Sequence, residues 1–206
     1  IFSPARRVRN NTTKHTLENI LATREVVINV VNYDIVQQTS LASTEYPEGV
    51  NEFIKAGFKM LKSTLVKPFR VAESPVQFEC RVNEVIPLGK EGGAGNLVIA
   101  EILCMHIDEA CLDENGNIDQ QKLDLVARAG GNYYSRAREG FFSIPKPLQT
   151  MGIGIDQLPE SVQKSHILSG NELAQLGNAA AQPSPDDVNK FLKENPEFAG
   201  MNLTEM

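Results

Sequence analysis

Basic and hydroxyl side chains are concentrated near the start of the sequence, just ahead of a predicted helix. The segment 3–16 combines three arginines and a lysine with four hydroxyl groups: Arg6, Arg7, Arg9, Lys14, Ser3, Thr12, Thr13 and Thr16. The free N–H groups and positive dipole end of a helix start attract phosphate. Lysine and arginine add charge, and threonines add directional hydrogen bonds. The segment predicts a phosphate site, although a solvated basic segment with an ordinary helix cap explains it equally well.

A second cluster of potential ligand-binding residues lies at 128–134, where Arg128 precedes the run Gly-Gly-Asn-Tyr-Tyr. Paired glycines let the backbone approach a flat ligand closely, and a tyrosine ring can flank that ligand. A tight turn with core aromatic residues would produce the same pattern, and local composition alone favours the turn.

Other patterns point away from metal and nucleophile chemistry. The glycine-rich segment 89–96 is followed by a strand, so we expect a hairpin loop and not a phosphate loop. The acidic segment 113–119 lacks a carboxylate at the first position of a calcium loop, which predicts a simple turn. The three histidines and three cysteines lack metal-ligand spacing and any obvious Cys/His pairing. We therefore expect no metal site.

The composition limits the class of protein. The chain has 206 residues and a formal charge of −6, with 20 Lys and Arg against 26 Asp and Glu. This balance argues against nucleic acid or an anionic membrane as the main partner. No apolar run approaches the roughly 20 residues that span a bilayer, and the arginine-rich start is not a signal peptide. We expect a cytoplasmic protein with reduced cysteines.

Several segments have the residue types and periodicity of β-strands. Residues 25–31 are mostly β-branched and almost continuously apolar, which predicts a buried strand. Residues 76–82 alternate between apolar and polar side chains, which predicts a half-buried antiparallel strand with Glu79 on its polar face. Further strands are predicted at residues 97–107 and 141–144.

Helices are predicted between and after these strands. Thr12 and Thr13 are typical caps, and Leu17, Ile20 and Leu21 follow at the spacing of one apolar helix face. Shorter helices are expected at 34–44, at 50–56 with a terminating glycine, and at 123–126, 160–168 and 171–176. Hairpin-connected strands with inserted helices predict a mainly β or α+β fold, or a closed antiparallel barrel, and not alternating βαβ units.

The composition changes near residues 145–154, which predicts two parts. We expect a main domain at 1–153 and a helical C-terminal extension at 154–206. The last helix of the extension has a capping-box pattern, with Ser184 as the cap, Pro185 in the first turn and Asp187 three residues after the cap.

Six segments of the main domain follow one another in a recognisable order: residues 1–7, 11–20, 25–31, 43–53, 73–80 and 128–134. In this order they resemble the flavin reductase-like family of FMN-binding split barrels. The resemblance covers about residues 1–150, and the extension is similar to the tail of longer bacterial members.

The resemblance implies an antiparallel split β-barrel that forms a homodimer, with FMN near the subunit interface. Contacts to the FMN phosphate and ribityl chain are then expected from Ser3, Arg6, Arg7, Asn11, Lys14 and Thr16. Arg128, Gly131 and Tyr134 would line the neighbourhood of the flavin ring. Family members also carry a pair of strands ahead of the position that corresponds to Ile1. We expect this strand pair to be absent from the given sequence.

The function implied by the resemblance is hydride transfer from NAD(P)H to FMN, with an electron-acceptor protein as a potential partner. This chemistry needs alignment of two cofactors and no nucleophile or base from the protein. Two alternatives stay open: an FMN-binding electron carrier without a nicotinamide site, and a binding or assembly protein without the cofactor.

Overall fold

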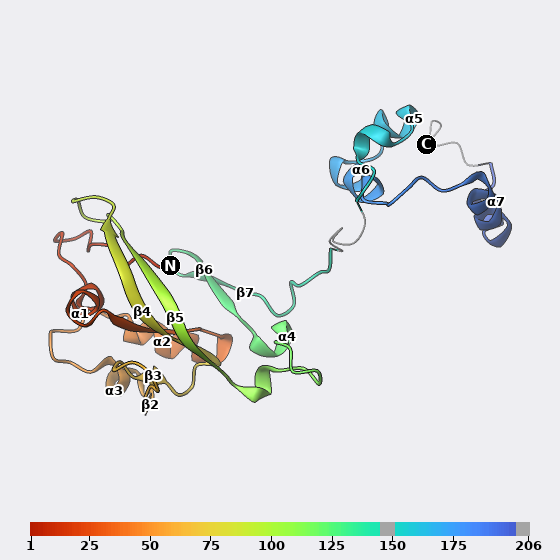
Figure 1. Cartoon of the computed structure of the whole chain (residues 1–206). Coiled ribbons are helices and arrows are strands. Elements are labelled where there is room, and N and C mark those ends of the chain that lie inside the picture. The colour runs from red at the N-terminus through yellow and green to blue at the C-terminus, as the bar shows by residue number, and fades with distance from the viewer. Residues whose placement is uncertain (145–150, 201–206) are drawn as a thin grey trace. The chain divides into compact units, whose positions relative to one another are not determined.

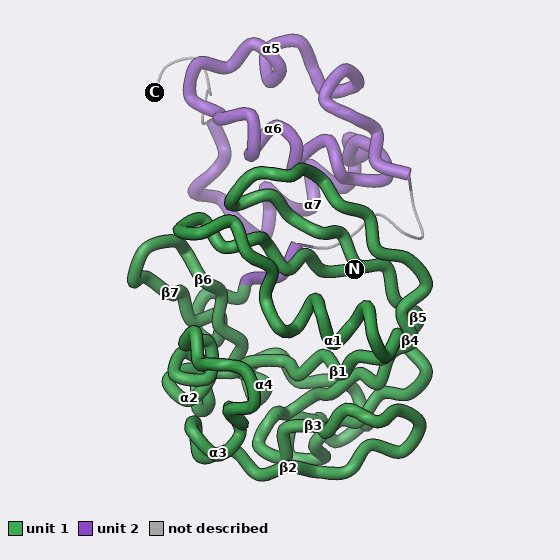
Figure 2. Tube along the Cα trace, turned by 90° about the vertical axis from the view of Figure 1, so that its left-hand side faces the viewer, with its two compact units in different colours: residues 1–141 green, residues 142–206 purple. Residues whose placement is uncertain are grey.

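The computed structural model describes residues 1–144 and 151–200. The chain divides into two compact units, Ile1–Phe141 and Phe142–Met206 (Figure 2). No helix of the described residues is both long and apolar enough to cross a membrane.

An antiparallel three-stranded sheet forms the centre of the first unit, in the order β1–β4–β5 (Figure 1). Its strands are β1 (Glu25–Asn29), β4 (Val76–Pro87) and β5 (Asn96–Ile107). The last two form a long hairpin, with Val82 opposite Ala100. Its loop is the glycine-rich segment, so the predicted hairpin is confirmed.

Helices and two short hairpins complete the first unit. The helices are α1 (His15–Thr23), α2 (Val36–Ala42), α3 (Glu52–Ala56) and α4 (Gln120–Leu123). The hairpins pair β2 (Met60–Leu61) with β3 (Arg70–Val71), and β6 (Val126–Gly130) with β7 (Tyr133–Arg136). The unit is therefore α+β with antiparallel sheets, as the sequence predicts.

The core consists of two apolar clusters. Ile20 of α1 packs with Val82 and Val98 of the long hairpin. Leu17 is buried as predicted, but Leu21, predicted on the same helix face, is 53% exposed. Val76, Cys111 and Leu123 form the second cluster, beside α4. Burying a side chain of this size stabilises the fold by about 1.5–3 kcal/mol.

The second unit contains α5 (Glu160–Gln163), α6 (Gly170–Gly177) and α7 (Pro185–Glu194). The predicted capping box of the last helix is confirmed, and α6 begins with another. Gly177 is the one buried residue among those described in this unit. Local capping therefore defines these helices more than burial does.

Several expected elements differ in the structure. Residues 141–144 form no strand. The helix predicted at 123–126 ends at Leu123, because the chain then enters β6. The helix predicted at 160–168 is limited to α5. Neither Thr12 nor Thr13 caps α1: the cap position is Lys14, and the Thr13 hydroxyl instead donates to Glu18.

The most informative difference concerns Glu79, which the alternation places on a polar face. Its side chain is 0% exposed. Its carboxylate accepts hydrogen bonds from the backbone N–H groups of Thr64, at 2.8 Å, and Leu65, at 2.6 Å. His106 Nε2 lies 2.8 Å away, and Arg70 Nε lies at 3.6 Å. The carboxylate therefore fastens the loop before β3 to the sheet.

Burial by itself would raise the pKa of Glu79. The hydrogen bonds from the two backbone N–H groups and from His106 outweigh this effect and leave the pKa below its ordinary value of 4.5. A lowered pKa in the folded state means that the ionised carboxylate stabilises the fold above about pH 4.5. This stabilisation is lost as the pH falls through the lower, folded-state pKa.

Replacing Glu79 by glutamine tests this arrangement. The glutamine side chain has only one oxygen to accept the hydrogen bonds that the carboxylate now receives, and its NH₂ group would face the backbone N–H groups of the loop. We therefore expect Glu79→Gln to lower the free energy of unfolding by about 2–4 kcal/mol at pH 7. The difference from the wild type should shrink below pH 4.5. Urea unfolding across this pH range measures both effects.

The matched control is Glu101→Gln, which removes an exposed carboxylate 3.9 Å from Arg81. Exposed pairs contribute little, so this variant should unfold like the wild type. If the two variants behave alike, Glu79 does not anchor the loop.

Candidate functional site

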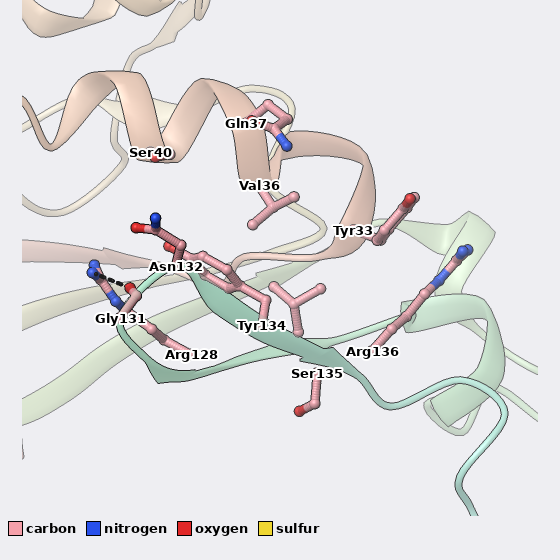
Figure 3. Close-up of a pocket in the computed structure, with 11 residues that line it drawn as sticks. Tyr33, Val36, Gln37, Ser40, Arg128, Gly131, Asn132, Tyr134, Ser135 and Arg136 are labelled. Atoms are coloured by element: carbon pink, nitrogen blue, oxygen red, sulfur yellow. Dashed lines mark hydrogen bonds between the residues drawn. The ribbon is translucent and has the colours of Figure 1, made fainter.

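A pocket of about 320 Å³ lies between α2 and the β6–β7 hairpin (Figure 3). Three residues predicted to bind a ligand, Arg128, Gly131 and Tyr134, are all in its lining, so the structure brings this predicted group together. Val36 of α2 points toward the hairpin across the pocket. The remaining lining residues are Tyr33, Gln37, Ser40, Val126, Asn132, Ser135 and Arg136.

The turn of the hairpin depends on its paired glycines. Gly130 has a φ of 93° and Gly131 a φ of 52°, values that other residues rarely adopt. No atom lies within 4 Å of the place where a side chain would start at either position, so the backbone is open here. Arg128 donates to the carbonyl of Gly131 at 3.0 Å and lies 5.9 Å from the ring of Tyr134.

The hairpin is fastened to the rest of the unit by Arg136. Its guanidinium donates to both carboxylate oxygens of Asp124, over 2.6–3.1 Å, and stacks 3.8 Å from the ring of Tyr33. The backbone N–H of Tyr33 in turn donates to the carbonyl of Asp124 at 3.0 Å. Hydrogen bonds from Arg136 lower the pKa of Asp124.

The opening segment forms a loop on the tip of the β4–β5 hairpin. Backbone hydrogen bonds join Arg6 to Ala94, at 2.9 Å, and to Gly93, at 3.0 Å. The Arg6 side chain donates to Asn11 at 2.6 Å, and Asn11 donates to the carbonyl of Lys90 at 3.0 Å. Arg6 and Asn11 therefore hold the loop in shape.

Arg7 lies in a second pocket, of about 430 Å³, that His15 also lines. Its guanidinium forms an ion pair with Glu45 at 2.9 Å and donates to the hydroxyl of Thr12 at 3.1 Å and to the carbonyl of Thr13. Glu45 therefore offsets the charge of Arg7, and Arg7 supports the backbone that leads into α1.

Lys14 and Thr16 lie at the N-terminus of α1, where no side chain caps the helix. Both are exposed, and neither side chain has a hydrogen bond or an ion pair with a described residue. The N–H of Leu17 donates to the carbonyl of Lys14 at 2.9 Å, so this helix start offers an anion the N–H groups of His15 and Thr16 and its positive dipole end. Ser3 is also exposed and lies against Gly95, where any side chain would clash with its hydroxyl.

Of the six residues predicted in the opening segment, only Arg7 lines the second pocket, so the structure does not bring this predicted group together as it does the hairpin group. The two pockets share no lining residue. Helix α2 connects them. Ser40 lines the first pocket, and Glu45, just beyond the end of the helix, lines the second. The segment from Tyr33 to Glu45 therefore links the two pockets and reaches the opening segment through Arg7.

Sequence reasoning missed the pocket residues of α2 and their support. The sequence predicts a helix there, but nothing in its local pattern indicates that Tyr33 and Ser40 face a hairpin about a hundred residues later. Glu45 lies in one of the segments that carry the family resemblance, which is a signal that could have identified it. Within the described part of the chain, no three His, Cys, Asp or Glu residues are placed to hold a metal ion.

Asp124→Asn tests whether Arg136 positions the hairpin. The neutral amide weakens the paired hydrogen bonds, so amide hydrogens of β6 and β7 should exchange roughly 5- to 30-fold faster than in the wild type. Hydrogen-exchange mass spectrometry measures this directly. Glu160→Gln, which removes an exposed ion pair with Lys164 in the second unit, should leave exchange in the hairpin unchanged. Unchanged exchange in Asp124→Asn would contradict the positioning role.

Comparison with known proteins connects these features to a family. The profile of the flavin reductase like domain matches residues 6–127. An uncharacterized protein of Aquifex aeolicus is 34% identical over 128 residues, which is 62% of this chain and 63% of that protein. A protein of Halalkalibacterium halodurans is 32% identical over 67% of this chain and 66% of its own length. The chain thus spans slightly less than two thirds of these relatives.

Solved structures show the same fold. A protein from Shewanella frigidimarina described as a flavin reductase with a split barrel domain has 29% identity and a TM-score of 0.57, over 64% of this chain and 65% of that one. Nitrilotriacetate monooxygenase component B from Bacillus cereus has 23% identity and a TM-score of 0.60, over 65% of this chain and 66% of that one. The predicted split-barrel class with inserted helices is confirmed. The chain belongs to the flavin reductase-like family.

Proposed function

We propose that the chain is an FMN-binding oxidoreductase that transfers a hydride from NAD(P)H to FMN. Membership of the flavin reductase-like family supports a flavin ligand. The observation that carries the choice of FMN, a flavin with a terminal phosphate, is the uncapped N-terminus of α1 with the exposed side chains of Lys14 and Thr16.

The phosphate would be held by three kinds of group at this helix start. The first backbone N–H groups of α1 point along the helix axis toward it. Lys14 would supply a positive charge, and the Thr16 hydroxyl a directional hydrogen bond. Because the chain has a net charge of −6, attraction of a phosphate depends on such local groups and not on the overall field.

The other predicted residues of the opening segment would act mainly by holding this geometry. Arg7 bonds to Thr12 and Thr13, directly ahead of Lys14. Arg6 and Asn11 fix the loop to the β4–β5 hairpin. Ser3, at the edge of the same loop, is exposed, and its hydroxyl would bind the ribityl chain.

The flavin ring would lie near the pocket of Arg128, Gly131 and Tyr134. The open backbone at Gly131 and the tyrosine ring suit a flat ligand, and Arg128 forms no ion pair with a described residue, so its charge is available to an electron-rich ring edge. When bound, FMN supplies the hydride-accepting chemistry. The residues of this chain bind and orient the ring, and no proton transfer is assigned to them.

We also propose that the chain works as a homodimer, as the family resemblance implies. A partner subunit would cover apolar side chains that one copy leaves exposed, such as Tyr133 beside the ring pocket. Sedimentation equilibrium with and without FMN measures the mass, and a monomer under both conditions would contradict this part of the proposal.

The phosphate site is tested by titrating FMN into Lys14→Ala and Thr16→Ala variants. Each removes a hydrogen bond to a charged group, so we expect the dissociation constant to rise about tenfold or more in each variant. Quenching of flavin fluorescence provides the readout. Lys190→Ala, which removes an exposed lysine of α7, is the matched control and should bind like the wild type. Equal affinity in all four proteins would place the phosphate elsewhere.

The reaction is tested by following NADH and NADPH oxidation with added FMN. The proposal predicts turnover with at least one nucleotide. FMN binding without any nucleotide oxidation would support an electron carrier that receives electrons from a protein. Failure to bind FMN at all would support a binding or assembly role without the cofactor.

A further inference from the structure

One segment of the first unit has a charge opposite to that of the whole chain. Residues 55–70 contain five of the 20 basic residues and none of the 26 acidic ones, although the chain has a net charge of −6. The segment runs from the end of α3 through β2 to the start of β3. These elements lie together at one end of the first unit in both views (Figures 1 and 2).

The same segment exposes large apolar side chains. Met60 is 47% exposed, Leu61 41%, Leu65 56% and Phe69 48%. Lysines alternate with them along the chain, so charge and apolar surface occur together. Several large apolar side chains exposed close together in one segment are typical of an interaction surface and not of ordinary solvated surface. We call Lys59, Lys62 and Lys67 with these four apolar residues the basic–apolar face.

The three lysines have no ion pair among the described residues, although carboxylates lie nearby. Those carboxylates bond the backbone of the segment instead. Glu73 accepts from the N–H of Lys59 at 3.1 Å, and Glu25 from the N–H of Lys67 at 2.8 Å. Buried Glu79 accepts from two further N–H groups of the same loop. The acids therefore fix the loop, and the ammonium groups stay available.

A fixed backbone lowers the entropy cost of binding, because little of the loop must be ordered when a partner arrives. The segment is therefore pre-organised to present its charges. Nothing in the proposed flavin site uses this segment, since it contains none of the residues proposed to hold FMN and lines neither of the two pockets.

The positive charge of the basic–apolar face favours some classes of binding partner over others. In a two-fold symmetric dimer formed through this face, the lysines of one copy would lie against the lysines of the other. Repulsion between these like charges disfavours such a dimer. Nucleic acid is disfavoured as a partner because the rest of the chain is acidic and would repel it. The face also contains only one aromatic side chain, Phe69, on which a base could stack. An acidic protein segment with interspersed apolar side chains matches both the charge of the lysines and the exposed apolar side chains.

We propose that the basic–apolar face is a docking surface for an acidic segment of another protein. The lysines attract and orient the acidic side chains, which raises the association rate and makes it depend on salt. The four apolar side chains contribute most of the affinity once water is excluded. This surface is independent of the flavin site, so either proposal can hold without the other.

The test uses a fluorescein-labelled 15-residue peptide with Glu at alternate positions and Leu, Phe and Ser between them. Fluorescence anisotropy should show saturable binding to the full chain at about 50 mM salt, weakened tenfold or more at about 300 mM. Two control peptides, one with every Glu replaced by Lys and one with every Leu and Phe replaced by Ser, should bind at least tenfold more weakly. No binding below about 1 mM overturns the proposal.

Two variants locate the binding surface. Lys59→Glu/Lys62→Glu should weaken peptide binding tenfold or more, and Leu65→Ser/Phe69→Ser should do the same without changing charge. Lys190→Glu/Lys193→Glu is the matched charge control in α7 and should bind like the wild type. FMN affinity should be unchanged in all three, which separates this proposal from the flavin site.

Three further outcomes would overturn the proposal. Equal weakening by the control variant would mean that binding responds only to net charge. Co-sedimentation with phosphatidylserine vesicles, with no peptide binding, would assign the face to a membrane. A change in the oligomeric state of Leu65→Ser/Phe69→Ser, without peptide binding, would assign it to another copy of this chain.

Discussion

The pairing of β4 with β5 is the constraint on which the candidate site depends. At the tip of this hairpin, Ala94 and Gly93 hold the backbone of Arg6, and further along β5 the backbone of Val98 pairs with Phe2. Val98 is fully buried and also packs against α1. The hairpin thus fixes both the opening loop and the helix that the loop leads into, and so places Lys14.

The other end of the same hairpin supports the ring pocket. Val76, at the start of β4, packs with Leu123 at the end of α4. The next residue, Asp124, holds Arg136 and therefore β7. Two candidate sites that are far apart in sequence are thus supported by the two ends of the same hairpin.

The sequence predicts the parts of the fold that rest on local patterns. The strands and the glycine-rich turn of the long hairpin follow from periodicity, and the start of α7 follows from its cap residues. Glu79 does not, because its alternation is that of a solvent-facing side chain. A loop from residues 63–67 covers it, and only tertiary structure brings those N–H groups to the carboxylate.

The same distinction applies to the site. Arg128, Gly131 and Tyr134 are close in sequence, so their meeting in one pocket follows from a tight turn. The pairing of Arg7 with Glu45 joins residues 38 positions apart, and no local pattern indicates it. This pairing changes how the opening segment is understood, because it makes Arg7 a support for the loop. Lys14, like Arg6 and Arg9, has no ion pair among the described residues, but of these three cations it is the one at the start of α1.

The most direct test of the central claim compares the affinity of the full chain for FMN and for riboflavin, which lacks the phosphate. If the start of α1 holds the phosphate, FMN should bind at least tenfold more tightly than riboflavin. That preference should disappear in the Lys14→Ala/Thr16→Ala double variant, with riboflavin affinity unchanged. Equal affinity of the wild type for the two flavins would contradict the claim.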